Sequence, residues 1–115
     1  DQRRSARFYE AVLGRAPTLD VPGMTEFALG DSAVLGLMPV AGARRLLGGG
    51  VVGEAPAQPR SELYLRVADP AAMHARALAE GARESSPLVR RDWGDDAAYS
   101  VDPDGHLLAF AAPAR

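Results

Sequence analysis

The sequence feature that most constrains the fold of this chain is an internal repeat. Residues 7–14 (RFYEAVLG) and residues 74–81 (HARALAEG) each predict a short amphipathic helix that ends at glycine, the residue that most readily adopts the left-handed conformation just beyond a helix. Asp69 and Pro70 are typical of a helix start before the second copy. Asp1 is the corresponding cap of the first copy, one residue out of register. One helical pattern therefore occurs twice.

Each predicted helix is followed by three segments with the pattern of strands. The second half has a further strand-like segment before its helix, at residues 61–67, and the first half has none. We therefore predict an α+β fold of two βαβββ repeats that form a cupped mixed sheet, with helices on its outer face and the first strand missing from this chain. The predicted strands after the helices are residues 18–21, 25–29, 33–40, 84–91, 96–101 and 107–111.

The repeats define the expected domain organisation. Residues 1–40 form the first module, without its first strand, and residues 61–115 form the second, the two together making one domain. Residues 41–60 are rich in Gly, Ala and Pro and are expected to be a linker without secondary structure. A run of this length in a compact domain is also found covering a site or acting as a hinge for exchange between subunits, and both alternatives stay open.

Composition excludes several classes of function. All 13 basic residues are arginine, and the sequence contains no Cys and no Lys. Disulfides, thiolate nucleophiles, Cys-ligated metals and lysine Schiff bases are therefore excluded. The net charge is −2 and the arginines are dispersed, which argues against a nucleic-acid partner. No apolar run approaches the about 20 residues of a membrane span, and no signal-peptide pattern is visible. We expect a cytoplasmic protein.

The strand at residues 62–67 alternates strictly between polar and apolar side chains. Its apolar set is expected to pack on the helices, so that Glu62, Tyr64 and Arg66 point to the opposite face. That face is either a solvated sheet surface or the wall of a small-ligand hollow. An ion pair between Glu62 and Arg66 is favoured over a general base at Glu62.

Three further residues are candidates for a site. Trp93, the only Trp, lies in a polar loop, where it is either a stacking surface at a cleft mouth or a core residue. His74 is expected to be a solvated helix residue and His106 to brace a turn. Two scattered histidines without a third partner make neither a zinc site nor a nucleophilic triad.

Several motifs together resemble a known family. Phe8-Tyr9 with Leu13-Gly14 near one end, and Trp93-Gly94-Asp95, Tyr99 and residues 102–108 (DPDGHLL) near the other, resemble the vicinal oxygen chelate superfamily of glyoxalases, bleomycin-resistance proteins and extradiol dioxygenases. The resemblance implies paired βαβββ units around a cup. It also implies a homodimer, often with an exchanged element or a cleft shared between subunits.

The resemblance also implies where a metal would bind. Enzymes of the superfamily hold a divalent metal with His and Glu on the strands that line the cup. By this resemblance Glu62 occupies one ligand position, Ala109 occupies the position of the final Glu, and Gly36 is its repeat counterpart. Neither Ala nor Gly can bind a metal through a side chain, and the remaining ligand would belong to the missing strand. No metal or other cofactor is therefore predicted.

Retaining the cup without the metal resembles the drug-binding branch of the superfamily. We therefore predict a metal-independent small-molecule-binding protein, with antibiotic binding or sequestration, and hence antibiotic resistance, as its suggested role and no catalytic residue assigned. The alternative is a metal-dependent lyase, isomerase or dioxygenase of the glyoxalase type with a rearranged ligand set. A third reading is a regulatory or interaction domain whose own side chains fill the cup. The predicted ligand-binding residues are Glu62, Tyr64, Arg66, Trp93, Tyr99 and Met38.

Overall fold

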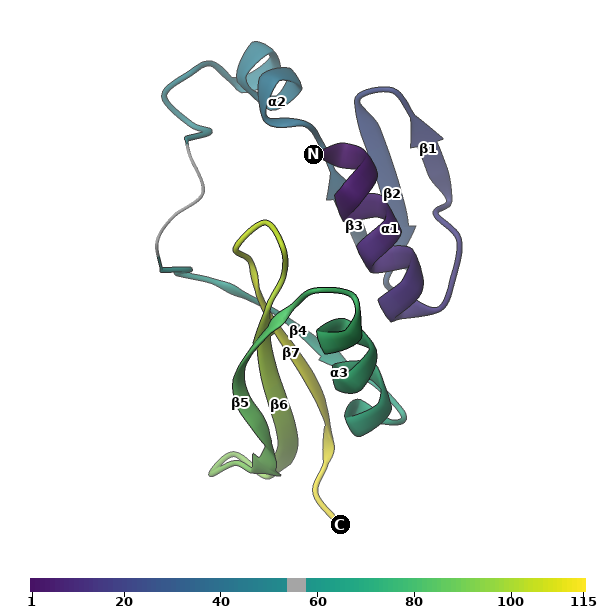
Figure 1. Ribbon diagram of the computed structural model, residues 1–115, viewed down its shortest axis with the longest axis vertical. Helices are drawn as coiled ribbons and strands as arrows, with labels where there is room; N and C mark the ends of the chain where they lie inside the picture. Colours follow the sequence, from purple (N-terminus) through teal and green to yellow (C-terminus); the bar gives the residue numbers. More distant parts are fainter. Residues whose placement is uncertain (54–57) are drawn as a thin grey trace. The chain divides into compact units, whose positions relative to one another are not determined.

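The computed structural model describes residues 1–53 and 58–115. The chain divides into two compact units, unit 1 (Asp1–Ala55) and unit 2 (Pro56–Arg115). Unit 1 contains α1 (Gln2–Leu13), β1 (Leu19–Val21), β2 (Met24–Ala28), β3 (Val34–Leu37) and α2 (Val40–Leu47) (Figure 1). Unit 2 contains β4 (Glu62–Arg66), α3 (Pro70–Ala79), β5 (Arg83–Arg90), β6 (Asp95–Val101) and β7 (Leu107–Pro113).

In unit 1, α1 packs on one face of an antiparallel sheet of order β1-β2-β3. The helix begins where the Asp1 carboxylate accepts a hydrogen bond from the backbone N–H of Arg4, 3.1 Å away, and it ends at Gly14 in the left-handed conformation. The core of the unit contains Phe27, which is fully buried, and the ring of Tyr9, whose centroid is 6.5 Å from that of Phe27. The predicted cap and stop of the first helix are confirmed.

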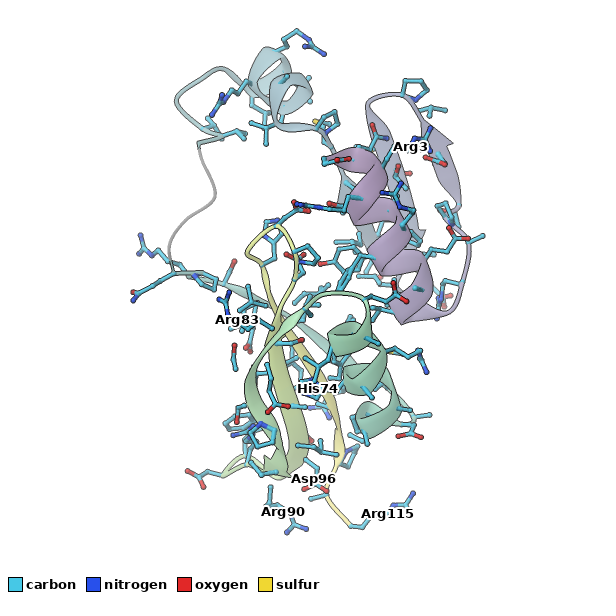
Figure 2. The ribbon with its side chains drawn as sticks, in the orientation of Figure 1. Arg3, His74, Arg83, Arg90, Asp96 and Arg115 are labelled. Atoms are coloured by element: carbon cyan, nitrogen blue, oxygen red, sulfur yellow. The ribbon has the colours of Figure 1, made fainter. Side chains whose placement is uncertain are left out.

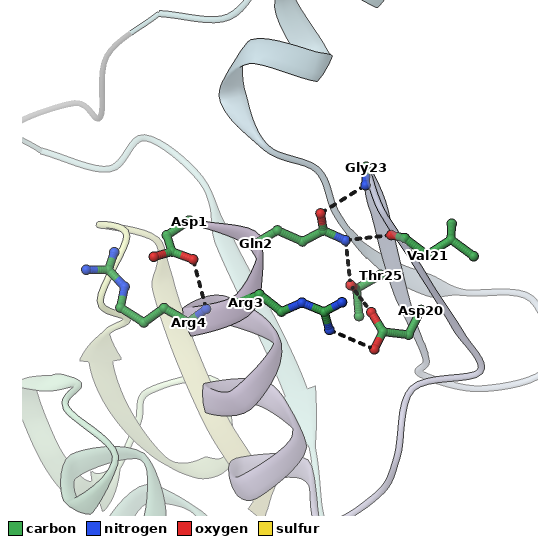
Figure 3. A network of polar contacts seen from close by, with 8 residues as sticks. All are labelled: Asp1, Gln2, Arg3, Arg4, Asp20, Val21, Gly23 and Thr25. Atoms are coloured by element: carbon green, nitrogen blue, oxygen red, sulfur yellow. Dashed lines mark hydrogen bonds and ion pairs between the residues drawn. The ribbon is translucent and has the colours of Figure 1, made fainter.

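A polar network ties the start of α1 to the β1–β2 hairpin (Figure 3). The Gln2 amide donates to the carbonyl of Val21 and to the hydroxyl of Thr25, both at 2.9 Å, and accepts from the backbone N–H of Gly23 at 3.0 Å. The Thr25 hydroxyl in turn donates to Asp20 at 2.9 Å. One glutamine side chain therefore satisfies polar groups on both sides of the hairpin turn.

Helix α2 lies in the segment that the sequence predicted to be a linker without secondary structure. That expectation is wrong for residues 41–47. The predicted strand at residues 33–40 ends at Leu37 because Pro39 caps the new helix, which begins at Val40. Ala43 to Leu47 are good helix formers, but the surrounding glycines suggested a coil. None of the side chains of α2 is buried. Val40, Ala43 and Leu47 recur at helical spacing, but this pattern is only eight residues long and lies beside a run of glycines.

Unit 2 is a βαβββ unit with a mixed sheet of order β4-β7-β6-β5, in which β4 runs parallel to β7 and the other neighbours are antiparallel. Helix α3 covers one face of this sheet. It begins as predicted, with Pro70 in its first turn and the Asp69 carboxylate accepting from the backbone N–H of Ala72 at 3.0 Å. Leu108 and Phe110 on β7 are fully buried in the core of the unit. The α+β fold class predicted from the sequence is confirmed.

His74 is a core residue, and the expectation that it is solvated is wrong. Its side chain, labelled on α3 in Figure 2, is almost completely buried. The ring lies 6.4 Å from the ring of Phe110, and its Nε2 atom is 2.9 Å from a carboxylate oxygen of Glu84 on β5. The sequence of the helix does not show that Glu84, on the edge strand β5, lies next to His74. A histidine can be buried when its ring nitrogen has such a hydrogen-bond partner.

The turn between β6 and β7 contains the Asp-Pro-Asp-Gly motif. One carboxylate oxygen of Asp102 accepts from the backbone N–H groups of both Asp104 and His106, each at 2.9 Å. Gly105 has a φ of 93°, which a residue with a side chain rarely adopts. Among the described residues this motif therefore closes the hairpin. His106 is exposed and contributes its backbone N–H to the turn, as predicted for a residue that braces a turn.

Candidate functional site

The candidate site is the face of the unit 2 sheet opposite α3, which we call the open face. Side chains of directly paired residues point to the same face of a sheet. The pairing of β4 with β7 and of β7 with β6 therefore places Tyr64, Ala109 and Tyr99 in one row across the open face. The rows on either side of it are Glu62, Leu107 and Val101, and Arg66, Ala111 and Ala97.

Two of the predicted site residues bind one buried carboxylate, and a third donates a hydrogen bond to one of these two. Asp95 accepts a hydrogen bond from the Tyr64 hydroxyl at 2.7 Å, and both of its oxygens lie 3.1 Å from guanidinium nitrogens of Arg66. The indole Nε1–H of Trp93 donates to the Tyr64 hydroxyl oxygen at 2.9 Å. We call Tyr64, Arg66, Trp93 and Asp95 the Asp95 network. Of the two alternatives for Trp93, the core residue is excluded, because Trp93 is 59% exposed.

Arg66 pairs with Asp95 and not with Glu62, so the ion pair favoured from the sequence is wrong. Two residues separated by four positions on a strand are about 13 Å apart, whereas the turn before β6 brings Asp95 within reach of the guanidinium. Glu62 is exposed, and within residues 1–53 and 58–115 no hydrogen bond or ion pair engages its carboxylate. A free carboxylate therefore remains on the open face.

The side chain of Tyr64 crosses the small residues of the sheet. Tyr64 on β4 and Asp95 on β6 are separated by β7, and the line that joins them passes over Ala111. Ala111, Ala97 and Ala109 are all fully buried. Alanine at these positions leaves room for the phenol ring to lie along the sheet, and this end of the open face is closed by the protein's own side chains.

The other end of the open face is less covered. Glu62 is exposed, and its row partners Leu107 and Val101 are only half-buried. Tyr99 is also half-buried, and its ring lies 5.1 Å from the guanidinium carbon of Arg91. Arg91 is held in place by hydrogen bonds to the carbonyls of Ala97 and Pro87 and to the hydroxyl of Ser86. The space for a ligand on this face is therefore at the Glu62 end.

The two ends of the open face are far apart along the strands. Glu62 pairs with Leu107, and Asp95 pairs with Pro113 at the opposite end of β7. At about 3.3 Å per residue, the levels of Glu62 and Asp95 differ by about 20 Å. A ligand that contacts Glu62 and also stacks on Trp93 must therefore be elongated.

Both tyrosines of the open face bind their proton more tightly than a free phenol. Burial raises the pKa of Tyr64 above its ordinary value of 10.0, and the Asp95 carboxylate adds to the rise, while the hydrogen bond from Trp93 opposes it. Burial likewise raises the pKa of Tyr99, followed by the negative charge of Glu62, and the Arg91 charge opposes the rise. Glu62 and Tyr99 are therefore electrostatic neighbours.

These shifts predict a loss of stability at alkaline pH. Because the folded-state pKa of each tyrosine lies above the unfolded value near 10.0, the associated stability is complete below that pH and is lost as the pH rises through the folded pKa. We expect Tyr64→Phe and Tyr99→Phe each to reduce the alkaline decline in the urea midpoint. Tyrosinate absorbance of the folded wild type should also rise at higher pH than that of the urea-unfolded chain. Coincident titrations would contradict the prediction.

The residues present do not fit a chelated divalent metal. Ala109 and Gly36 occupy the positions at which the resemblance places ligands, and neither has a donor side chain. Among the residues that the structure describes, no group of three or more His, Asp or Glu side chains could hold a metal ion. Glu62 is the single carboxylate at an expected ligand position, and a hard divalent cation needs several converging oxygen ligands.

Met38 is the one predicted site residue that lies in unit 1, where it follows β3 and is half-buried. Its place in a common site with the unit 2 residues stays a prediction. Asp95 was missed by the sequence interpretation because it was placed in the polar loop before the strand predicted at residues 96–101, and Arg91, at the end of the strand predicted at residues 84–91, was not considered as a site residue. The period-two pattern of Asp95, Ala97 and Tyr99 would have placed Asp95 on the face of Tyr99 if the strand had been started one residue earlier.

A hollow of about 430 Å³ lies elsewhere in unit 2, beside the start of α3. Its lining includes Asp69, Pro70, Leu88, Asp96 and Ala112. Asp96 is held 3.3 Å from the guanidinium of Arg90, and both side chains are labelled in Figure 2. None of the predicted ligand-binding residues lines this hollow.

The fold and motifs define the class of protein. Residues 1–111 match the family model described as a glyoxalase-like domain. The chain belongs to this family, and with it to the vicinal oxygen chelate superfamily. No curated protein matches the sequence. None of the helices among the described residues is both long and apolar enough to span a membrane.

Solved structures with the same fold carry related names. A glyoxalase-related enzyme from Fulvimarina pelagi is 28% identical, with a TM-score of 0.82 over 97% of this chain and 80% of that chain. A glyoxalase/bleomycin resistance protein/dioxygenase family enzyme from Burkholderia phytofirmans PsJN is 16% identical, with a TM-score of 0.84 over 99% of this chain and 91% of that chain. A glyoxalase/bleomycin resistance protein/dioxygenase from Nocardioides is 23% identical, with a TM-score of 0.76 over 98% and 76%. At such identities the last two show the fold alone.

Proposed function

We propose that the protein binds an elongated organic cation on the open face of unit 2 without a metal, in the manner of an antibiotic-binding or sequestering protein. The observation that carries the proposal is the exposed carboxylate of Glu62 beside Tyr99, which no hydrogen bond or ion pair engages within the described part of the chain, on a face whose other acidic residue is already paired with Arg66. A cationic group at Glu62 gains a charge-assisted hydrogen bond, and aromatic rings on the same face attract a positive charge.

The separation of the two ends supports an elongated ligand. A planar group has an exposed stacking surface at Trp93, and the cationic group has its partner at the level of Glu62. The polar groups of the Asp95 network bond to one another, so the network presents the rings of Trp93 and Tyr64 to a ligand instead of competing polar groups. The names of the structural relatives add bleomycin as a specific compound to test.

The proposal predicts that Glu62 discriminates by charge. Metal-free bleomycin and proflavine, a planar cation, are expected to bind in calorimetric titrations, and the neutral planar compound phenazine is expected to bind more weakly. Glu62→Gln should weaken binding of the cations about tenfold or more, because a neutral amide oxygen replaces the charged acceptor. Glu80→Gln removes another exposed acid, at the end of α3, and should leave binding unchanged.

Melting temperatures measured with the same compounds and with metal ions test the alternative function. If Ni²⁺, Mn²⁺ or Zn²⁺ raises the melting temperature while none of the organic compounds does, the protein is a metal-dependent enzyme with a rearranged ligand set, and the proposal is wrong. Equal binding of proflavine to the wild type and to Glu62→Gln would remove Glu62 from the site.

We further propose that the protein acts as a cytoplasmic homodimer with no membrane or nucleic-acid partner. Light scattering after size-exclusion chromatography and nucleic-acid binding assays would check this proposal.

A further inference from the structure

The turn that carries Trp93 has a fixed backbone. Between β5 and β6, the backbone N–H of Arg91 donates to the carbonyl of Asp95 at 2.8 Å, and that of Gly94 donates to the carbonyl of Arg91 at 3.1 Å. The carbonyl of Gly94 accepts from Ala114 at 2.9 Å, and the φ of 98° at Gly94 suits glycine alone among ordinary residues. The position of the Trp93 backbone is therefore set by the turn.

The direction of the Trp93 side chain is set by a single hydrogen bond. The indole is 59% exposed, so packing around it is incomplete, and its one N–H group donates to the Tyr64 hydroxyl at 2.9 Å. A side chain with this little burial would otherwise sample several rotamers. The bond to Tyr64 is what selects one orientation.

The Asp95 carboxylate leaves the Tyr64 hydroxyl oxygen available to accept the hydrogen bond from Trp93. A carboxylate only accepts hydrogen bonds, so the Tyr64 hydroxyl must donate its one proton to Asp95, which leaves the phenol oxygen free to accept from Trp93. The two bonds in series also polarise each other in the same sense. Asp95 is 5% exposed, and Arg66 compensates its charge through two nitrogens.

We propose that Asp95 is the positioning residue of the binding face: through Tyr64 it orients the indole of Trp93, and through its ion pair it holds the guanidinium of Arg66. Asp95 itself lies beneath these groups and is not a contact for the ligand. The inference about binding rests on the proposed function, whereas the orientation of Trp93 in the free protein does not depend on it.

The test uses the single Trp of the chain as its own reporter. In the free protein, Tyr64→Phe and Asp95→Asn are expected to increase acrylamide quenching of Trp93 and to shift its emission to longer wavelength. The double variant should show no more change than Tyr64→Phe alone, because the effect of Asp95 passes through the Tyr64 hydroxyl. Asp92→Asn removes an exposed carboxylate next to Trp93 and is the matched control that should leave the quenching unchanged.

Tyr64→Phe keeps the ring that covers the alanines, so the test does not depend on whether Asp95→Asn folds. Additive effects of Asp95→Asn and Tyr64→Phe, or quenching in Tyr64→Phe equal to that of the wild type, would overturn the proposal. With metal-free bleomycin, an elongated cation, as the probe, Asp95→Asn should weaken binding about three- to tenfold. If no organic cation binds the wild type, the proposed function fails, but the quenching result still decides the role of Asp95.

Discussion

Replacing Phe110 with alanine is expected to lower the free energy of unfolding of unit 2 by about 3–5 kcal/mol. Phe110 lies on β7, a central strand of the sheet, is fully buried, and has the ring of His74 6.4 Å away. Its removal leaves a cavity between α3 and the sheet, and the buried histidine loses its aromatic neighbour. A loss of this size is a large part of the about 5–15 kcal/mol that stabilises an ordinary domain.

Urea unfolding followed by Trp93 fluorescence measures this loss in the unit that contains the mutation, because the only Trp lies in unit 2. Leu88→Ala on β5, where the side chain is 36% exposed, is the control and should cost much less. A midpoint for Phe110→Ala no lower than that of Leu88→Ala would show that Phe110 does not hold α3 on the sheet.

Replacing Ala111 with leucine is expected to destabilise unit 2 by about 1–3 kcal/mol and to disrupt the Asp95 network. Ala111 is fully buried and lies under the path of the Tyr64 side chain toward Asp95. The larger side chain requires the phenol ring to move. This displacement lengthens and weakens the 2.7 Å hydrogen bond between the Tyr64 hydroxyl and Asp95. Trp93 then loses its hydrogen-bond partner.

Ala112→Leu is the matched control, because Ala112 is the next residue on β7, points to the other face, and lines the hollow of about 430 Å³ beside α3. A larger side chain has room there. We expect Ala111→Leu, and not Ala112→Leu, to increase acrylamide quenching of Trp93 in the folded protein. Unchanged quenching in Ala111→Leu would mean that Tyr64 does not depend on the alanine beneath it.

The sequence predicted the elements of the fold and the composition of the open face. The caps at Asp1 and Asp69 and the stop at Gly14 are local features, and each was recognised from residues a few positions apart. The alternation along β4 correctly separated Tyr64 and Arg66 from the leucines of the core face. Helix α2 was missed because its apolar pattern spans only eight residues and lies beside a run of glycines.

The partners within the site could not be predicted in the same way. Asp95 is 31 positions from Tyr64 and 29 from Arg66, and the sequence contains other carboxylates that lie much nearer along the chain. The burial of His74 likewise depends on Glu84, which the return of β5 along α3 brings to it. Such pairings depend on strand order and register, which no local pattern states.

By itself, the sequence determined that this chain is a repeated α+β fold, that one face of the strand at residues 62–66 is polar, and that metal ligands are absent at Gly36 and Ala109. Periodicity and capping are properties of neighbouring residues, and the presence or absence of a donor side chain needs no structure. Only the tertiary structure decided that Arg66 pairs with Asp95 and that, among the residues the structure describes, no partner engages Glu62. The physical reason is that an ion pair is selected by distance in space, and the order β4-β7-β6 sets that distance.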